Sequence, residues 1–293
     1  MVFGEINSMI AVIERGVNVF KRWKTRPVTT VSQRFVELFE AHGVRRNQIP
    51  RVFGHDLALS DLVDNASLFA KLTEPVLDSA CTLFGVRREW LDTAEEEPYA
   101  PHSFYKYPSD FQCFIEKLKD AHPETQLSGY LVVADKAVPQ DQAFLILAEP
   151  IALLGDTTIY RYHVCDTWIF GYWKSRAYLA ACVAIAWKHG VHITGRCADR
   201  RAMSILADSR HLPGLVLEQL ASSGRRWYAE DLLLQPDVYL RGVDPETDDF
   251  GVASALSLWL QLDDEGWMDT GLRKNVRSAF ESALKAYQAI EQP

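Results

Sequence analysis

The stretch YLVVADKAVPQDQAFLILAEPIALLGDTTIYRYHV, residues 130–164, decides the fold class of the chain. Three runs in it are rich in β-branched, aromatic and aliphatic residues, which predicts strands at 130–134, 143–147 and 158–164. Gly155-Asp156 separates the last two runs and predicts a hairpin. Because no helical pattern interrupts the three runs, we expect them to pair antiparallel.

Helical patterns flank this stretch on both sides. Asp110–Ala121 precedes it, and Ser175–His189 follows it with an uncharged apolar run of 11 residues at 177–187. A membrane span needs roughly 20 apolar residues, so this run predicts a buried helix. A further strand is predicted at 191–195, and further helices at 199–209, 215–222, 252–262 and 272–290. We therefore expect an α+β or α/β domain over 102–293, with a mixed, mainly antiparallel sheet flanked by helices.

The first third of the chain is predicted to be all helical. Met9, Ile13, Val17 and Phe20 recur at helical spacing and precede the basic stretch 21–26. Residues 1–30 are therefore either a docking helix with a solvated linker or an arm that contacts DNA phosphate or a membrane surface. Residues 31–95 form a separate helical module, and the acidic, proline-containing stretch 95–101 is the predicted connection to the larger domain.

Length, charge distribution and cysteine spacing limit which classes of protein the chain can belong to. The chain has 293 residues, enough for two domains, and a net charge of −8. Residues 1–54 hold nine Lys and Arg against four Asp and Glu, whereas residues 55–100 hold three against ten. The five cysteines include no C-x-x-C pair, which argues against a disulfide framework or a paired-cysteine zinc site. With no signal-peptide pattern, we expect a cytoplasmic protein without a membrane partner.

The back end of the helical module carries a family resemblance. LTEPVLDSACTLFGVRREWL at 72–91 has a helix ending in FGV, a short turn and a WL anchor. Together with SQRFVELFEAHGVRRNQIPRVFG before it, this makes residues 31–92 resemble the helix-turn-helix module of Cro and phage repressors. The resemblance implies that the third helix enters the major groove of DNA. It also implies a dimer.

The predicted third-helix region departs from that pattern. HDLALSDLVDNASLF at 55–69 carries three aspartates, and no Lys or Arg lies between Arg51 and Lys71. The candidate DNA contacts are then in the second helix and at its start: Arg45, Arg46, Asn47, Gln48 and Arg51. The alternative is a retained helical scaffold that serves dimerisation or docking.

The larger domain holds a dense aromatic and basic group, which predicts a pocket for an anionic or planar ligand. Its members are Tyr160, Tyr162, Trp168, Tyr172, Trp173, Lys174 and Arg176. Tyr160 and Tyr162 are expected to share a sheet face turned toward the helix that follows, and 224–227 is expected to form an exposed turn. No established catalytic motif is present, and His163, Cys165, Asp166, His189, His192 and Cys197 match no common zinc spacing. We therefore assign no catalytic residue, metal or cofactor.

Three functions follow as hypotheses. The first is a DNA-associated transcriptional regulator whose larger domain senses a small molecule or a protein. The second is a protein-interaction adaptor built on a helix-turn-helix scaffold that does not bind DNA. The third is an enzyme centred on residues 160–176. The predicted partners are DNA, a protein and a second copy of the chain, the last through the amphipathic C-terminal helix.

Overall fold

The structure is a computed structural model that describes residues 29–121, 123–124, 126–136, 140–244, 251–271 and 276–291. The predicted helix at 8–26 and the basic stretch 21–26 lie outside these residues. The N-terminal elements are α2 (Val31–Ala41), η2 (Arg46–Gln48), α3 (Ile49–Phe53), η3 (Leu59–Leu62), α4 (Asn65–Phe69), α5 (Glu74–Phe84) and α6 (Arg88–Thr93). The larger domain contains α7 (Pro108–Ala121), β1 (Ser128–Ala134), β2 (Gln142–Leu154), β3 (Thr157–Ile169), α8 (Trp173–Lys188), β4 (His192–Ala198), α9 (Arg200–Ala207), α10 (Gly214–Ser223), β5 (Arg226–Tyr228), α11 (Asp231–Leu234), α12 (Pro236–Leu240), α13 (Val252–Asp264) and α14 (Arg277–Glu291).

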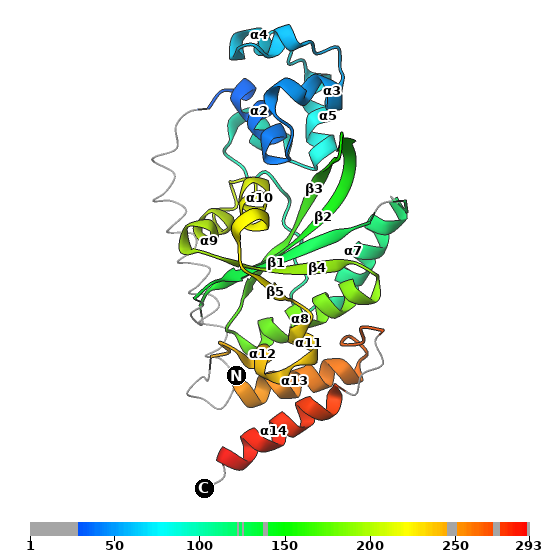
Figure 1. The fold of residues 1–293 in the computed structure, drawn as a ribbon, viewed down its shortest axis with the longest axis vertical. Helices are drawn as coiled ribbons and strands as arrows, with labels where there is room; N and C mark the ends of the chain where they lie inside the picture. Colours follow the sequence, from blue (N-terminus) through cyan, green and yellow to red (C-terminus); the bar gives the residue numbers. More distant parts are fainter. Residues whose placement is uncertain are drawn as a thin grey trace.

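The predicted fold class is confirmed. The described strands form one mixed sheet in the order β3-β2-β1-β4-β5. Every neighbouring pair is antiparallel except β1 with β4, which run parallel after the crossover through α8. Strands β2 and β3 form a long hairpin that turns at Gly155, whose φ of +63° favours glycine. This hairpin extends well beyond the rest of the sheet (Figure 1).

Helices cover the two faces of the sheet unequally. One face packs against α7, α8 and the C-terminal helices and holds the larger core, which includes Leu131, Leu147 and Trp168. The other face packs against α9 and α10 through a smaller core that includes Val132 and Ile146. Because successive strand residues point to opposite faces, each strand contributes to both cores. No helix of the described chain is long and apolar enough to cross a bilayer.

Tyr160 and Tyr162 do share a face, with their rings 6.5 Å apart. The expectation that they point toward the following helix, α8, is wrong. Tyr162 packs in the cores on the α9 and α10 side, whereas Cys165 and Trp168 lie in the core beneath α8. A bulge where β3 pairs with β2 between Phe144 and Ile146 changes the alternation along β3, which sequence spacing alone does not reveal.

The segment expected to be an exposed turn at 224–227 is also different in the structure. Arg226–Tyr228 forms the edge strand β5, which pairs antiparallel with β4. Three residues are too few to show an alternating pattern in the sequence, so this strand can be recognised only from its pairing with β4. The consequence is that Arg226 lies beside Arg196 in the sheet.

Local sequence features mark the start of α2, for which Thr30 and Ser32 are the two candidate caps, and the end of α5. Thr30 caps α2 in a capping box with Gln33, and Gly85 ends α5 in the left-handed conformation. Thr73 occupies the N-cap position of α5 without a side-chain cap bond. The predicted short helices at 57–72 are η3 and α4.

The module shares its core with the far end of the β2–β3 hairpin. Leu154 and Ile159 of the hairpin pack in the same cluster as Phe39 and Phe84 of the module. A Cβ atom at Gly214, the first residue of α10, would lie 1.7 Å from the carbonyl oxygen of Ala41, so only glycine permits this approach. Figure 1 shows the module seated on the hairpin beside α10.

The predicted acidic connection is packed along the domain rather than free of it. The Arg87 amide donates to the Pro98 carbonyl at 2.7 Å, and the Tyr99 hydroxyl hydrogen-bonds the buried ring of His42 at 3.0 Å. Further along, the His102 amide donates to Val164 of β3. The module and the sheet are therefore held together both by the connection and by their shared core.

Candidate functional site

The region that would read DNA in the resembled family is not a continuous helix. It is divided into η3, of four residues, and α4, of five. The division occurs at Asp64, which starts α4 as its N-cap by accepting a hydrogen bond from the Ser67 amide at 2.7 Å. His55 and Asp56, which precede η3, both have positive φ, so the chain turns sharply after Gly54. A straight recognition helix does not form here.

The carboxylates of this region are accessible to solvent to different degrees. Asp61 accepts a hydrogen bond from the Ala58 amide at 2.9 Å, and the bond from the Ser67 backbone amide lowers the pKa of Asp64 below its ordinary value. These two acidic side chains place negative charge close to the break between η3 and α4, where Asp64 is exposed and Asp61 is partly exposed. This charge repels a phosphate backbone and attracts a cationic partner.

The candidate DNA contacts differ in whether their side chains are bonded within the module or exposed to solvent. Arg46 is bound within the module, where its Nε donates to the Leu62 carbonyl at 2.7 Å and one terminal nitrogen donates to Asn65 at 3.0 Å. Gln48 accepts from the Arg45 amide at 2.9 Å. Arg45, Asn47 and Arg51 are exposed. The structure therefore leaves two of the three candidate arginines facing solvent.

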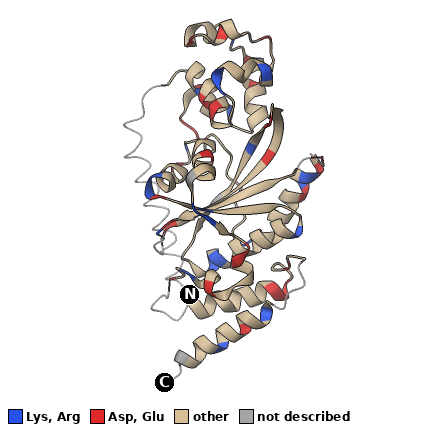
Figure 2. Cartoon of the chain, in the orientation of Figure 1, with Lys and Arg blue, Asp and Glu red and all other residues tan. Residues whose placement is uncertain are grey.

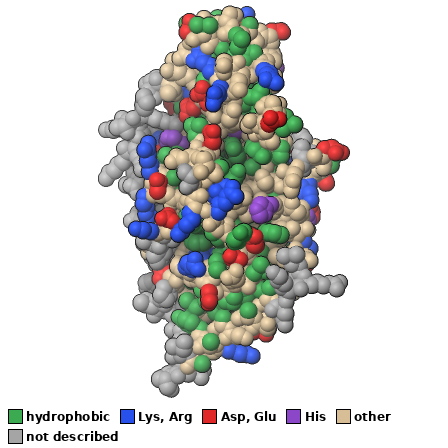
Figure 3. Space-filling view, viewed as in Figure 1, with side chains coloured by type: hydrophobic (Ala, Val, Ile, Leu, Met, Phe, Trp, Pro, Cys, Tyr) green, Lys and Arg blue, Asp and Glu red, His purple; other side chains and the backbone are tan. Residues whose placement is uncertain are grey.

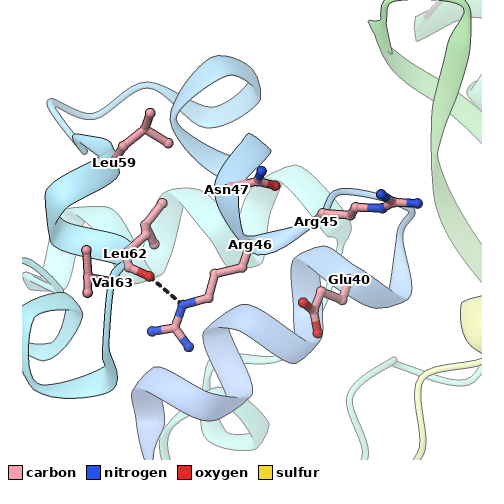
Figure 4. A pocket seen from close by; sticks show the side chains of 7 residues that line it. All are labelled: Glu40, Arg45, Arg46, Asn47, Leu59, Leu62 and Val63. Atoms are coloured by element: carbon pink, nitrogen blue, oxygen red, sulfur yellow. Dashed lines mark hydrogen bonds between the residues drawn. The ribbon is translucent and has the colours of Figure 1, made fainter.

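A shallow hollow of about 480 Å³ lies between the second-helix region and η3. Figure 4 shows Leu62 and Val63 on one side of it, Arg46 extended across it toward the Leu62 carbonyl, and Arg45 pointing away. Its lining residues are Glu40, Arg45, Arg46, Asn47, Leu59, Leu62 and Val63. The hollow is thus apolar on the η3 side and polar on the other.

Large apolar side chains surround the same break. Leu59 is 63% exposed, Val63 is 76% exposed and Phe69 is 63% exposed. Exposed large apolar groups that cluster over a short segment mark interaction surfaces more often than isolated ones do. We call these three residues the apolar patch. Asp61 and Asp64 lie within the same segment, so the patch has an acidic border.

The net charge of the module is acidic as well. Residues 29–97 contain seven Lys and Arg against twelve Asp and Glu, a net charge of −5. Arg88 is already held by Glu74, Asp78 and Asp92. Figure 2 shows the two signs intermixed over the module, with no continuous basic face in that view. A duplex-sized basic surface is not visible there.

The seven ligand-pocket candidates of the larger domain do not converge on one cavity. Tyr160 and Tyr162 lie on the face toward α9 and α10, and Trp168 is buried on the opposite face. Lys174 stacks over Trp173 at the start of α8, with its Nζ 4.9 Å from the ring centre. Tyr172 immediately precedes that helix as its N-cap residue.

Arg176 has no group left to offer a ligand. It is completely buried, and its guanidinium donates to the carbonyls of Phe170, Tyr239 and Arg241 at 2.8, 2.5 and 3.1 Å. Burial lowers the pKa of Arg176 to about 9. These bonds join the end of β3 to the loop after α12, which is a structural role.

The His, Cys and Asp residues compared above with zinc-binding spacings do not form a metal site in the described chain. No group of three or more His, Cys, Asp or Glu side chains in the described chain is close enough to hold a metal ion. His163 instead hydrogen-bonds the buried carboxylate of Glu149 at 2.8 Å, and Arg161 lies 3.5 Å from the same oxygen. Arg161 also donates to the carbonyls of Thr82 and Leu83 at the end of α5. This cluster couples the hairpin to the module.

Two buried charged residues of the sheet are not among the residues that the sequence singles out. Glu149 lies within β2, directly after its apolar run, and Arg196 interrupts the strand HITGRCA at 192–198. Both are nearly inaccessible to solvent. A charge within an otherwise apolar strand was the available signal, because buried charges are rare unless they are paired or functional.

Comparison with known proteins identifies no relative: no family model matches the chain, no curated protein is detectably similar to it, and no solved structure is detectably similar to it. The resemblance to Cro and phage repressors therefore rests on the residues of 31–92 alone.

Proposed function

We propose that the protein is an interaction adaptor whose N-terminal module docks a partner protein on the apolar patch and its acidic border. The observation that carries the proposal is the exposure of Leu59, Val63 and Phe69 in the segment where a DNA-binding relative would present its recognition helix. Apolar side chains exposed in this way gain free energy when a partner removes them from water.

The charge of the segment specifies the partner. Asp61 and Asp64 border the patch, and Arg46, the nearest cation, is bonded within the module. A complementary surface is therefore an amphipathic segment that carries apolar anchors flanked by Lys or Arg. Arg45 and Arg51 remain exposed. The DNA-regulator hypothesis therefore stays a prediction, which the DNA-binding measurement below tests.

The test uses the full chain with a photo-crosslinking residue in place of Ser60, which is exposed between Leu59 and Asp61. Two paired variants then probe the surface. Asp61→Asn with Asp64→Asn removes both charges but keeps an amide oxygen able to cap α4, because Asn caps helices as well as Asp does. Leu59→Ser with Val63→Ser removes apolar area. Glu95→Lys with Glu96→Lys is the control for a charge change elsewhere.

We expect a crosslinked protein partner that is lost in the apolar pair, is weakened in the Asn pair, and is kept in the control. Competition by a basic amphipathic peptide, and no competition by its acidic counterpart, identifies the charge of the contact. A crosslink that is unchanged in both patch variants overturns the proposal. Retardation of genomic DNA fragments at low and moderate salt that depends on Arg45 and Arg51 would instead support the regulator.

A further inference from the structure

The face of the sheet opposite α8 presents tyrosines and arginines on four strands. Tyr130 of β1 lies beside Thr194 of β4, which pairs in turn with Tyr228 of β5. Two residues along, Arg196 of β4 pairs with Arg226 of β5. Residues paired across neighbouring strands, and residues two apart on one strand, share a face. Tyr130, Tyr228, Arg196 and Arg226 therefore lie on the same side of the sheet.

Strand β3 adds Tyr160 to this side. Burial raises the pKa of Tyr130, the neighbouring Tyr160 adds to this, and Arg196 and Arg226 oppose it. The Tyr160 ring also stacks near Tyr162. Tyr228 is 70% exposed at the sheet edge. Figure 3 shows Lys and Arg side chains and a histidine gathered over β4 and β5, beside a recess next to α10.

Arg196 is the unusual group on this face. It is only 4% exposed, yet no carboxylate of the described chain pairs with it. One terminal nitrogen approaches the Gly224 carbonyl at 3.5 Å, and its Nε has no hydrogen-bond partner among the described residues. Burial lowers the pKa of Arg196, and the neighbouring charge of Arg226 lowers it further. A buried cation without a carboxylate partner is costly, and a like charge directly across the strand pair adds to the cost.

We propose that this face binds a nucleoside phosphate unit, with the phosphate held by Arg196 and Arg226 and the base stacked on the exposed ring of Tyr228. Guanidinium groups bind phosphate oxygens with two parallel hydrogen bonds, and the unused Nε of Arg196 supplies a donor for such a contact. Tyrosine rings on a sheet face accept bases of any sequence by stacking. A free nucleotide and a single-stranded nucleic acid both present this unit.

The experiment measures binding of four probes to the full chain: inorganic phosphate, AMP, and fluorescein-labelled twelve-residue dT and rU oligonucleotides. Arg226→Gln and Tyr228→Ala alter exposed side chains and are expected to leave the fold intact. We expect each to weaken binding about tenfold, because one stacked base or one phosphate contact contributes roughly that much. For the oligonucleotides, Arg226→Gln also lowers the slope of log affinity against log salt by about 1. Arg201→Gln on α9 and Tyr107→Ala are matched controls that remove an exposed arginine and an exposed tyrosine elsewhere.

Arg196→Met gives an independent readout. If Arg196 awaits a ligand, the variant abolishes binding and leaves the thermal midpoint of the free protein unchanged or raised, since an uncompensated charge is replaced by an apolar chain. Tight binding of AMP with weak binding of oligonucleotides assigns a free nucleotide, and the reverse assigns single strands. Absence of binding by all probes, binding that is equal in the tyrosine variant, or a fall in the midpoint of Arg196→Met overturns the proposal.

Discussion

Two buried arginines on opposite faces of the same sheet show how differently this protein treats its internal charges. Arg176, beneath the α8 side, places its guanidinium among the carbonyls of Phe170, Tyr239 and Arg241. Arg196, on the α9 and α10 side, has one contact at 3.5 Å and an Nε without a partner among the described residues. Little of either residue is exposed to solvent, 0% of Arg176 and 4% of Arg196, so the exposed fraction alone does not distinguish a charge satisfied by the fold from one left without acceptors.

The difference lies in hydrogen-bond satisfaction. A buried cation whose donors all have acceptors stabilises one arrangement of the surrounding chain. A buried cation whose donors lack acceptors destabilises the free protein and becomes favourable only when an anion arrives. On this criterion the α8 face and the junction with the module are structural, and the face formed by β1, β3, β4 and β5 is the place to look for a ligand.

The largest expected effect comes from Arg176→Met. The variant leaves three buried carbonyl oxygens without donors, which should lower the free energy of unfolding by about 4 kcal/mol. Urea denaturation followed by far-ultraviolet circular dichroism measures the change. The comparison predicts a large loss of stability for Arg176→Met and no loss for Arg196→Met. Equal losses of stability in the two variants would show that the arginines are alike and that hydrogen-bond satisfaction is a poor guide here.

The junction between module and hairpin offers a second test through His42. Its ring is buried, its Nδ1 donates to the Leu38 carbonyl at 2.6 Å, and its Nε2 accepts from the Tyr99 hydroxyl at 3.0 Å. The ring lies 5.4 Å from the stacked ring of Tyr162. Burial lowers the pKa of His42 from 6.5 to about 4. The unfolded chain therefore binds the proton first as pH falls, and the contribution of His42 to stability is lost between pH 6.5 and 4.

This loss amounts to about 3 kcal/mol, since each pKa unit corresponds to about 1.4 kcal/mol. Urea denaturation at pH 7 and at pH 4 measures it, and His42→Gln serves as the comparison because its side chain does not titrate. The wild-type chain should lose about 3 kcal/mol more than His42→Gln over this interval. Parallel pH dependence in the two proteins would mean that the ring is accessible to protons in the folded state.

Local sequence signals were sufficient for much of the fold. The sequence offers Thr30 or Ser32 as the cap of α2 and Gly85 as the end of α5, because capping and left-handed backbone depend on a few adjacent residues; the structure has Thr30 as the cap. Alternation and apolar runs predicted strands within β1, β2 and β3, although all three are longer in the structure. The fold class followed from these local patterns.

The candidate site on the sheet could not be predicted in the same way. Arg226 was assigned to a turn because β5 has only three residues and is defined by pairing with β4. Arg196 stands out only in the structure, where it is buried and contacts the Gly224 carbonyl but no carboxylate of the described chain. The direction of Tyr160 depended on a bulge in β3. Each of these facts comes from contacts between residues distant in sequence, which spacing does not encode.

The smallest expected effect concerns the end of α5, where Arg161 of β3 contacts the module, and it compares alanine substitutions at two glycines. Gly85 has a φ of +68°, and a Cβ atom there would lie 3.2 Å from the Cδ of Arg161. Gly190 has a similar φ of +72° with no atom within 4 Å of its would-be Cβ. Gly190→Ala should therefore cost only the backbone term, about 1 kcal/mol, whereas Gly85→Ala should cost about 2 kcal/mol because Arg161 must also move.

A double-mutant cycle separates the two contributions to Gly85→Ala. In the Arg161→Ala background the side-chain contact is absent, so the cost of Gly85→Ala should fall to that of Gly190→Ala. Urea denaturation of the four proteins in the cycle gives the coupling energy directly. A coupling of zero would mean that Arg161 does not press on the end of α5, and the module would then be held to the hairpin chiefly by the apolar core around Phe84, Leu154 and Ile159.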